Sequence, residues 1–88
     1  MFDITVHLPP SLTAPGPARE LAVRASTVRE AVERVVAREP QLAGRILHDG
    51  RPLVSFVLNG RNLRPSEALR TGLAHGDRLD VVPPVAGG

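Results

Sequence analysis

The sequence predicts an α+β fold in one small domain, with a mixed sheet of four to five strands packed on one main helix. Three observations carry this prediction: apolar residues alternate at the N-terminus, an amphipathic helical segment starts at Thr27, and β-prone runs follow it. The chain has 88 residues, enough for one modest core. We assign residues 1–83 to this domain and residues 84–88 to an extended, flexible C-terminal tail ending in Gly-Gly.

The first two strands are expected to form a hairpin. Apolar residues occupy every second position at the start of the chain, which is typical of a strand with one buried face. These residues are Phe2, Ile4, Val6 and Leu8. Residues 9–18 contain four prolines and a glycine, so we interpret them as a loop before a second strand at 20–24.

The main helix has a start signal, an apolar stripe and a stop signal. Thr27 and Glu30 stand at the spacing of a capping box, in which two side chains bind amides that the first helical turn leaves free. Apolar residues then recur every three or four positions, which places them on one face. They are Val28, Ala31, Val32, Val35 and Val36. Pro40 ends the helix, because the residue before a proline is driven out of helical geometry.

Two β-prone segments follow the helix. After a loop that includes residues 48–52, residues 53–58 are almost wholly apolar and predict an inner strand. Asn59-Gly60 is a tight-turn signal, and a short strand is expected at 62–64.

The last part of the chain is expected to return to the sheet. Residues 66–69 are interpreted as one helical turn capped by Ser66, and Asp77 is expected to bind the backbone of its own turn. The strand at 78–82 then completes the order ββαβ(β)β, with this last strand in the middle of the sheet. That is the ubiquitin-like β-grasp arrangement. A ferredoxin-like sandwich would need a second long helix, and residues 59–77 are too rich in turns to supply it.

Composition excludes several functions. The chain has no cysteine, so disulfides, thiolate metal sites and a cysteine nucleophile are ruled out. Its eleven basic residues are all arginines, scattered among nine acids, and it has only two aromatic residues, which argues against a nucleic-acid partner. No apolar run is long enough to span a membrane, so we expect no membrane partner and a cytoplasmic protein.

No catalytic or metal-binding motif is present. His7, His48 and His75 do not stand at metal-ligand spacing and are interpreted as surface or turn residues, so no metal site is predicted. The serines lack a nucleophile-elbow context, and no phosphate-binding glycine loop occurs.

The tail is expected to be a narrow, extended segment without strand pairing. Pro83 and Pro84 cannot donate to a strand ladder, so pairing of the last strand should end there. The five residues 84–88 could span about 17 Å when extended. Ala86, Gly87 and Gly88 have almost no side-chain bulk. A flexible end without function is the competing interpretation, but a thread launched from a folded core would suit a narrow channel in another protein.

The chain resembles the ubiquitin-like sulfur carrier proteins, which include the small subunit of molybdopterin synthase, the thiamine-pathway carrier and the cysteine-biosynthesis carrier of actinobacteria. The matching residues are TVREA at 27–31, VLNG at 57–60, LAHGDRL at 73–79 and VPPVAGG at 82–88. The resemblance covers nearly the whole chain. Residues 42–53 depart from the molybdopterin-synthase type and look closer to the cysteine-pathway carriers or to other carriers of specialised metabolism, so the pathway stays open.

The resemblance implies a carrier or cosubstrate, not an enzyme. In such proteins an E1-like adenylyltransferase uses ATP and Mg²⁺ to adenylate the terminal glycine, here Gly88, and no cofactor is bound by the carrier. A persulfide or sulfide donor then displaces AMP and leaves a thiocarboxylate. An acceptor synthase consumes the sulfur: the large subunit of molybdopterin synthase, or an enzyme similar to cysteine synthase or thiazole synthase.

Partner-facing residues are expected on the tail and on the exposed face of the sheet. They are Gly87, Ala86, Val85, Pro84, Phe56 and Leu58. For Phe56, burial in the core is the competing interpretation. Two other functions stay open: a protein modifier joined through Gly88 to target lysines, and a non-covalent β-grasp interaction module.

Overall fold

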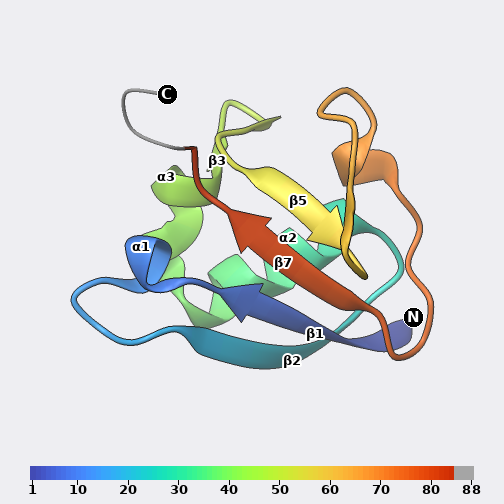
Figure 1. Cartoon of the computed structure of the whole chain (residues 1–88), viewed down its shortest axis with the longest axis horizontal. Helices are drawn as coiled ribbons and strands as arrows, with labels where there is room; N and C mark the ends of the chain where they lie inside the picture. Colours follow the sequence, from blue (N-terminus) through green and yellow to red (C-terminus); the bar gives the residue numbers. More distant parts are fainter. Residues whose placement is uncertain (85–88) are drawn as a thin grey trace.

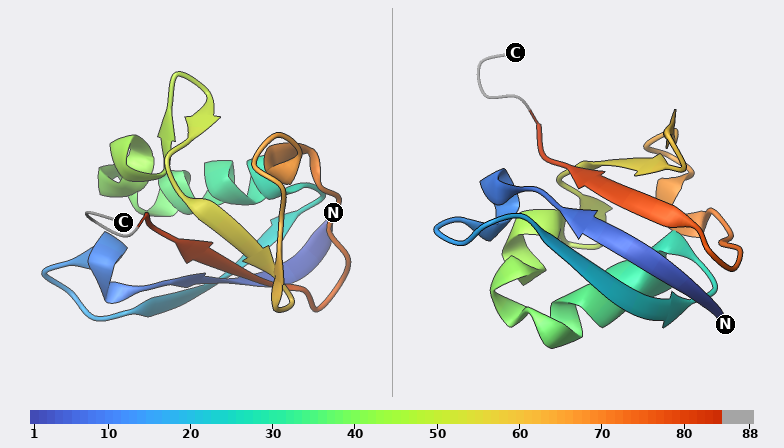
Figure 2. Two further views of the ribbon diagram at one scale, coloured as in Figure 1. Left: turned by 45° about the horizontal axis from the view of Figure 1, so that its top comes forward. Right: turned by 60° about the horizontal axis from the view of Figure 1, so that its bottom comes forward.

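The computed structural model describes residues 1–84 and shows a five-stranded sheet covered on one face by a helix (Figure 1). The strands of this sheet, in spatial order, are β2 (Arg19–Ala25), β1 (Phe2–Leu8), β7 (Arg78–Val82), β5 (Ser55–Leu58) and β6 (Arg61–Asn62). Helix α2 (Val28–Arg38) crosses the covered face, and the opposite face is open (Figure 2). The predicted α+β class is therefore confirmed.

The first and last strands of the described structure, β1 and β7, lie side by side in the centre of the sheet. β1 and β2 form an antiparallel hairpin, and β7 runs parallel to β1 on its other side. β5 pairs antiparallel with β7, so the last strand lies between the first strand and β5. A parallel neighbour requires a crossover connection, which α2 and the segment after it provide. This is the predicted β-grasp topology.

The core lies between α2 and the sheet and is apolar. Among residues 1–84 no polar or charged residue is buried. Phe56 is the largest fully buried side chain, at 1% exposure. The residues of the predicted helix stripe belong to the same core cluster, and Val36 is only partly buried against it. From α2, the buried residues are Val28, Ala31, Val32 and Val35. The hydrophobic pattern thus predicted the inward faces of β1 and α2, except at Phe2, which is 41% exposed.

The start of α2 differs in one contact from a capping box. The Oγ1 of Thr27 accepts a hydrogen bond from the Glu30 amide at 3.2 Å, as expected for the N-cap. The Glu30 carboxylate reaches past the cap residue and accepts from the Ser26 amide at 2.7 Å. Two free amides are still satisfied, so the start of the helix is well defined.

The predicted cap at Ser66 is wrong. The structure has a 3₁₀ turn, η2 (Ala68–Arg70), which starts two residues after the predicted start at Ser66 and lacks a side-chain cap. The Ala68 amide, which a Ser66 hydroxyl would have to bind, instead donates to the Arg64 carbonyl at 2.8 Å.

Thr27, which caps a helix, and Ser66, which does not, give a matched stability test. We expect Thr27→Ala to lower the free energy of unfolding by about 1 kcal/mol, because an amide loses its side-chain acceptor. Ser66→Ala should change it by less than about 0.5 kcal/mol. Urea denaturation followed by circular dichroism compares the two variants, and equal losses would contradict this account of the helix start.

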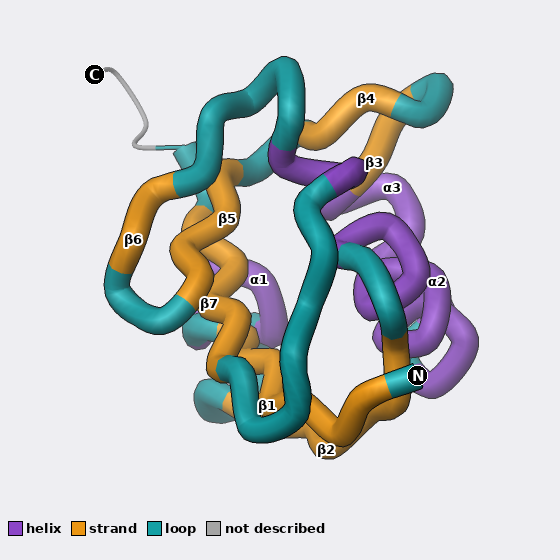
Figure 3. Tube along the Cα trace, turned by 90° about the vertical axis from the view of Figure 1, so that its right-hand side faces the viewer, coloured by secondary structure: helices purple, strands orange, loops and turns teal. Residues whose placement is uncertain are grey.

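Short helices and strands occupy segments that were predicted to be loops. Helix α1 (Pro10–Thr13) lies within the predicted loop 9–18, because Leu12 inserts into the core. After α2 come η1 (Pro40–Leu42), α3 (Ala43–Ile46) and a hairpin of β3 (Leu47–His48) and β4 (Arg51–Pro52). This hairpin stands apart from the main sheet, beside α3 (Figure 3).

The boundaries of two predicted strands also move. β5 starts at Ser55, because Leu53 lies outside the sheet and is 42% exposed. β6 is Arg61–Asn62, directly after the Asn59-Gly60 turn, one residue earlier than predicted. Both turn residues have positive φ, 51° and 85°, as a two-residue hairpin turn requires. In residues 1–84, no helix has the length and apolar character to cross a membrane.

Candidate functional site

The predicted reactive tail begins where the described structure ends. β7 stops at Val82, and Pro83 and Pro84 continue without ladder pairing. Four of the predicted site residues lie outside the described residues: Val85, Ala86, Gly87 and Gly88. Their roles in activation and partner binding therefore stay predictions. Pro84, the remaining tail residue of that set, is exposed.

A shallow groove of about 610 Å³ lies on the open face of the sheet where β7 ends. We call it the tail groove; it is lined by His7, Pro9, Ser11, Val57, Asp80, Val81, Val82, Pro83 and Pro84. Val82 is 42% exposed within it, which is unusual for a valine in a central strand. The groove thus places an apolar surface directly at the base of the tail, where a partner that grips the tail would also touch it.

Phe56 and Leu58 do not lie on the open face, so their predicted position there is wrong. Their exposed fractions are 1% and 6%, and both side chains join the core. Val57, between them, faces outward and lines the tail groove. An almost wholly apolar run shows no alternation, so the sequence alone does not tell which residues point inward. The pairing of Val57 with Asp80 on β7 decides it.

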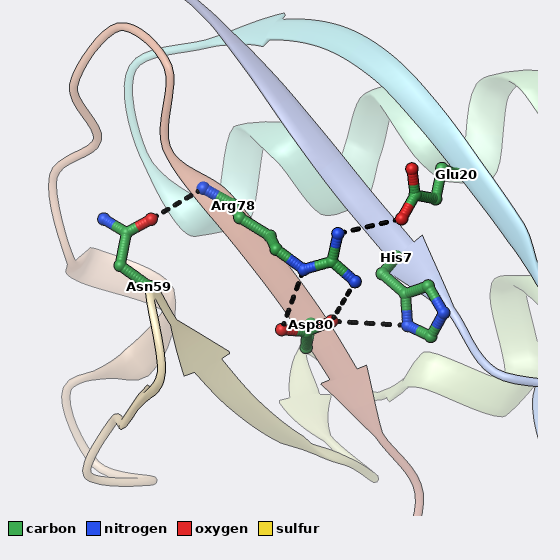
Figure 4. A network of polar contacts seen from close by, with 5 residues as sticks. All are labelled: His7, Glu20, Asn59, Arg78 and Asp80. Atoms are coloured by element: carbon green, nitrogen blue, oxygen red, sulfur yellow. Dashed lines mark hydrogen bonds and ion pairs between the residues drawn. The ribbon is translucent and has the colours of Figure 1, made fainter.

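A row of polar side chains crosses the open face beside the groove (Figure 4). The guanidinium of Arg78 donates to Glu20 on β2 at 2.8 Å and to Asp80 at 3.1 and 3.4 Å. The hydrogen bond to Glu20 has the largest effect, and together with the contacts to Asp80 it raises the pKa of Arg78 above its usual range. Arg78 therefore keeps its charge and ties the central strand to the edge strand β2.

His7 and Asp80 come together only in the folded protein. His7 Nδ1 lies 3.3 Å from Asp80 Oδ1, and both side chains are about a quarter exposed, at 28% and 26%. Both residues line the tail groove. From the sequence, His7 was interpreted as a surface or turn residue, and its pairing with Asp80 was not predicted, because β1 and β7 lie 70 positions apart in the chain and are neighbours only in space. Within residues 1–84 no cluster of side chains suited to a metal ion occurs.

The start of β7 is held by a polar bracket. The Arg78 amide donates to Asn59 Oδ1 at 2.8 Å, and Asn59 Nδ2 donates to Asp77 Oδ1 at 2.9 Å. Asp77 Oδ2 also accepts from the Ala74 amide at 2.7 Å, which confirms the predicted turn-binding role of Asp77. The VLNG and LAHGDRL stretches therefore form one structural unit that positions β7, and hence the base of the tail.

Comparison with known proteins identifies a matching family and two relatives. The ThiS family matches residues 13–88. Small archaeal modifier protein 3 of Haloferax volcanii is 38% identical over 65 residues, covering 72% of this chain and 71% of that protein. A protein of Archaeoglobus fulgidus, provisionally named a sulfur carrier protein, is 39% identical over 64 residues, covering 65% of this chain and 73% of that protein.

Among solved structures, a chain of the Amycolatopsis orientalis BexX/CysO complex has the same fold. It is 24% identical with a TM-score of 0.77, and the match covers 97% of this chain and 99% of that chain. The family match, the two relatives and the shared fold lead to one conclusion: this chain belongs to the ThiS family of ubiquitin-like sulfur carrier proteins.

Proposed function

We propose that this protein carries sulfur as a thiocarboxylate on Gly88 and acts as a cosubstrate of biosynthetic enzymes. Family membership is the observation that carries the proposal. The geometry of the described residues supports it, since β7 is clamped at its start and leads through Pro83 and Pro84 toward Gly87-Gly88, the last residues of the sequence. A carboxylate on glycine has no side chain to shield its carbon.

The proposed chemistry has two steps. The Gly88 carboxylate attacks the α-phosphorus of ATP, pyrophosphate leaves, and an acyl-adenylate forms. Sulfide then adds to the acyl carbon, the acyl–oxygen bond to AMP breaks, and a thiocarboxylate remains. Activation is required because a free carboxylate has no adequate leaving group. ATP and Mg²⁺ belong to the E1-like adenylyltransferase, which stabilises the charge that develops on the phosphates.

The described residues would bind and orient in this scheme. Arg78 and the Asn59–Asp77 bracket fix β7, so the tail leaves the domain from a rigid base. Because β7 is already ordered, it adds no ordering cost of its own when the tail enters a channel. The exposed Val82 offers apolar surface that the activating enzyme and the acceptor synthase would both cover. One chain of the solved BexX/CysO complex shares this fold, and its binding to another protein supports the inference of a protein partner.

Intact-mass spectrometry tests the proposal. The purified protein is incubated with its E1-like enzyme, ATP, Mg²⁺ and sulfide. We expect a mass gain that equals the exchange of one oxygen for one sulfur, and no gain when ATP is left out. An unchanged mass with an enzyme that consumes ATP in the presence of the protein would contradict the carrier role.

A second candidate function is a protein modifier, which the likeness to small archaeal modifier protein 3 favours. The same adenylate would then be attacked by a lysine of a target protein, with release of AMP and formation of an isopeptide bond. The chain itself has no lysine, so it could not be its own target. Tagged protein in a cell lysate should then form covalent adducts of higher mass, which a carrier alone would not form.

The tail groove can be tested with two residues of equal exposure. Val82 and Leu53 are both 42% exposed, but only Val82 lines the groove. We expect Val82→Glu to raise the KM of the activating enzyme for this protein by about tenfold or more, because a charge is buried at the interface. Leu53→Glu should change it by less than about twofold. Adenylation kinetics measure both, and equal effects would exclude the groove as the contact surface.

A further inference from the structure

The outer edge of β2 is free in the described structure. β2 is the terminal strand of the five-stranded sheet, and β1 is its partner on one side only (Figure 2, right). It is seven residues long, Arg19–Ala25. A free edge of this length presents backbone donors and acceptors to whatever binds there.

The register identifies the groups at this edge. The Thr5 amide donates to the Asp77 carbonyl at 3.0 Å, so the backbone groups of Thr5 point toward β7 and away from its cross-strand partner Ala22. Alternation then directs the N–H and C=O groups of Glu20, Ala22 and Arg24 outward. Leu21 and Val23 bond inward to β1 instead.

A groove runs along this edge between β2 and α2. We call it the edge groove; it has a volume of about 410 Å³ and is lined by Met1, Val23, Arg24, Arg34, Ala37 and Arg38. Met1, which is 57% exposed, and Ala37 supply apolar surface at the groove, whereas Val23 is only 3% exposed. Arg34 and Arg38 are exposed on α2, and among residues 1–84 neither forms an ion pair. Arg24 is paired with Asp3 at 3.3 Å, and the two side chains are 70% and 65% exposed.

We propose that the edge of β2 is a second binding site, which accepts an extended, acidic segment of a partner protein as an added strand. The outward groups of Glu20, Ala22 and Arg24 would pair with the backbone of the segment. Its apolar side chains would cover Met1 and Ala37, and its carboxylates would meet Arg34 and Arg38. This site is independent of the tail and of the proposed sulfur chemistry.

A second copy of the chain fits this edge less well. Two β2 strands related by a two-fold axis at Ala22 would pair Glu20 with Arg24, which is favourable. However, both helices would lie on the same face of the continuous sheet, with Arg34 and Arg38 of one copy facing those of the other. Like charges at such an interface cost affinity. An acidic strand meets the same arginines with the opposite sign.

The test uses a fluorescein-labelled peptide, acetyl-Glu-Asp-Val-Ile-Val-Asp-Glu, with fluorescence anisotropy as the readout. We expect Arg34→Glu/Arg38→Glu to weaken binding by at least about tenfold, because two charge contacts become repulsive. Arg61→Glu/Arg64→Glu is the matched control. It changes the net charge equally but lies at the opposite edge, on β6 and just after it, and should leave binding within about twofold.

Strand pairing is tested separately from charge. Ala22→Pro removes one outward N–H and puts a ring in the path of the segment, yet proline is tolerated at an edge position that faces solvent. It should weaken binding by about tenfold or more, and so should N-methylation of the central isoleucine of the peptide, which leaves the protein unchanged. Hydrogen exchange adds a residue-level readout: the amides of Glu20, Ala22 and Arg24 should be protected by the peptide, and those of Leu21 and Val23 should not change.

Three results would overturn the proposal. Binding that is sensitive to the arginine reversals but not to N-methylation would reveal general electrostatic attraction without an added strand. Protection of amides away from β2 would place the peptide elsewhere. Sedimentation of the wild-type protein as a dimer that Ala22→Pro converts to a monomer would assign the edge to a second copy.

Discussion

One residue added after Gly88 is expected to abolish thiocarboxylate formation. The reacting carboxylate would then belong to a different residue, displaced from Gly87-Gly88 by about 3.4 Å of extended chain, and near-attack geometry does not tolerate such a shift. The free energy of unfolding should not change, because the addition lies beyond the packed residues. Intact mass after incubation with the activating enzyme, ATP and sulfide measures the first effect, and urea denaturation measures the second.

The matched control adds the same residue before Met1, which is exposed and lies away from the tail groove. This variant should be thiocarboxylated at the wild-type rate. A non-covalent interaction module would be indifferent to both additions. Thiocarboxylation of the protein extended after Gly88 would show that Gly88 is not the site of activation.

Phe56→Ala is expected to cause the largest loss of stability, about 3–5 kcal/mol. Phe56 is 1% exposed and is the largest fully buried side chain, so truncation leaves a cavity between α2 and the sheet. A domain of this size has a total stability of only about 5–15 kcal/mol, so a large part of it would be lost. Urea denaturation followed by circular dichroism measures the change.

The only other phenylalanine supplies the control. Phe2 is 41% exposed at the start of β1, so Phe2→Ala should cost less than about 1.5 kcal/mol. If the two substitutions cost the same, Phe56 would not have the central place in the core described above.

The long elements could be predicted because local pattern and tertiary packing agree there. β1 alternates strictly and has one buried face, and the α2 stripe coincides with the face that packs on the sheet. The Thr27 cap and the Asn59-Gly60 turn depend on a few neighbouring residues, so their signals are readable from sequence.

The short elements were missed because their stability comes from the rest of the molecule. α1 and α3 have four residues each, too few to be stable alone. They are held by single buried side chains, Leu12 and Ile46, which fill the core. The β3–β4 hairpin did have a local signal, since Asp49-Gly50 is a turn dipeptide and both residues have positive φ, 51° and 75°.

Part of the candidate site could likewise be predicted from the sequence, and part depends on the tertiary structure. The tail and its Gly-Gly are visible in the sequence, whereas the groove at its base depends on strand order and on which residues of an apolar run face outward. Phe56 and Leu58 were predicted on the open face, but Val57 lies there instead, because the register between β5 and β7 pairs Val57 with Asp80. The His7–Asp80 pair and the β2 edge likewise arise from the order of strands in the sheet.

The most direct test of the carrier role locates the sulfur. The protein is incubated with its activating enzyme, ATP, Mg²⁺ and sulfide labelled with a heavy sulfur isotope; the product is then alkylated and sequenced by tandem mass spectrometry. We expect one labelled sulfur, found in the C-terminal fragment that contains Gly88. Label found elsewhere in the chain, or ATP-dependent activation of Gly88 that yields only isopeptide adducts and no labelled sulfur, would contradict the proposed function.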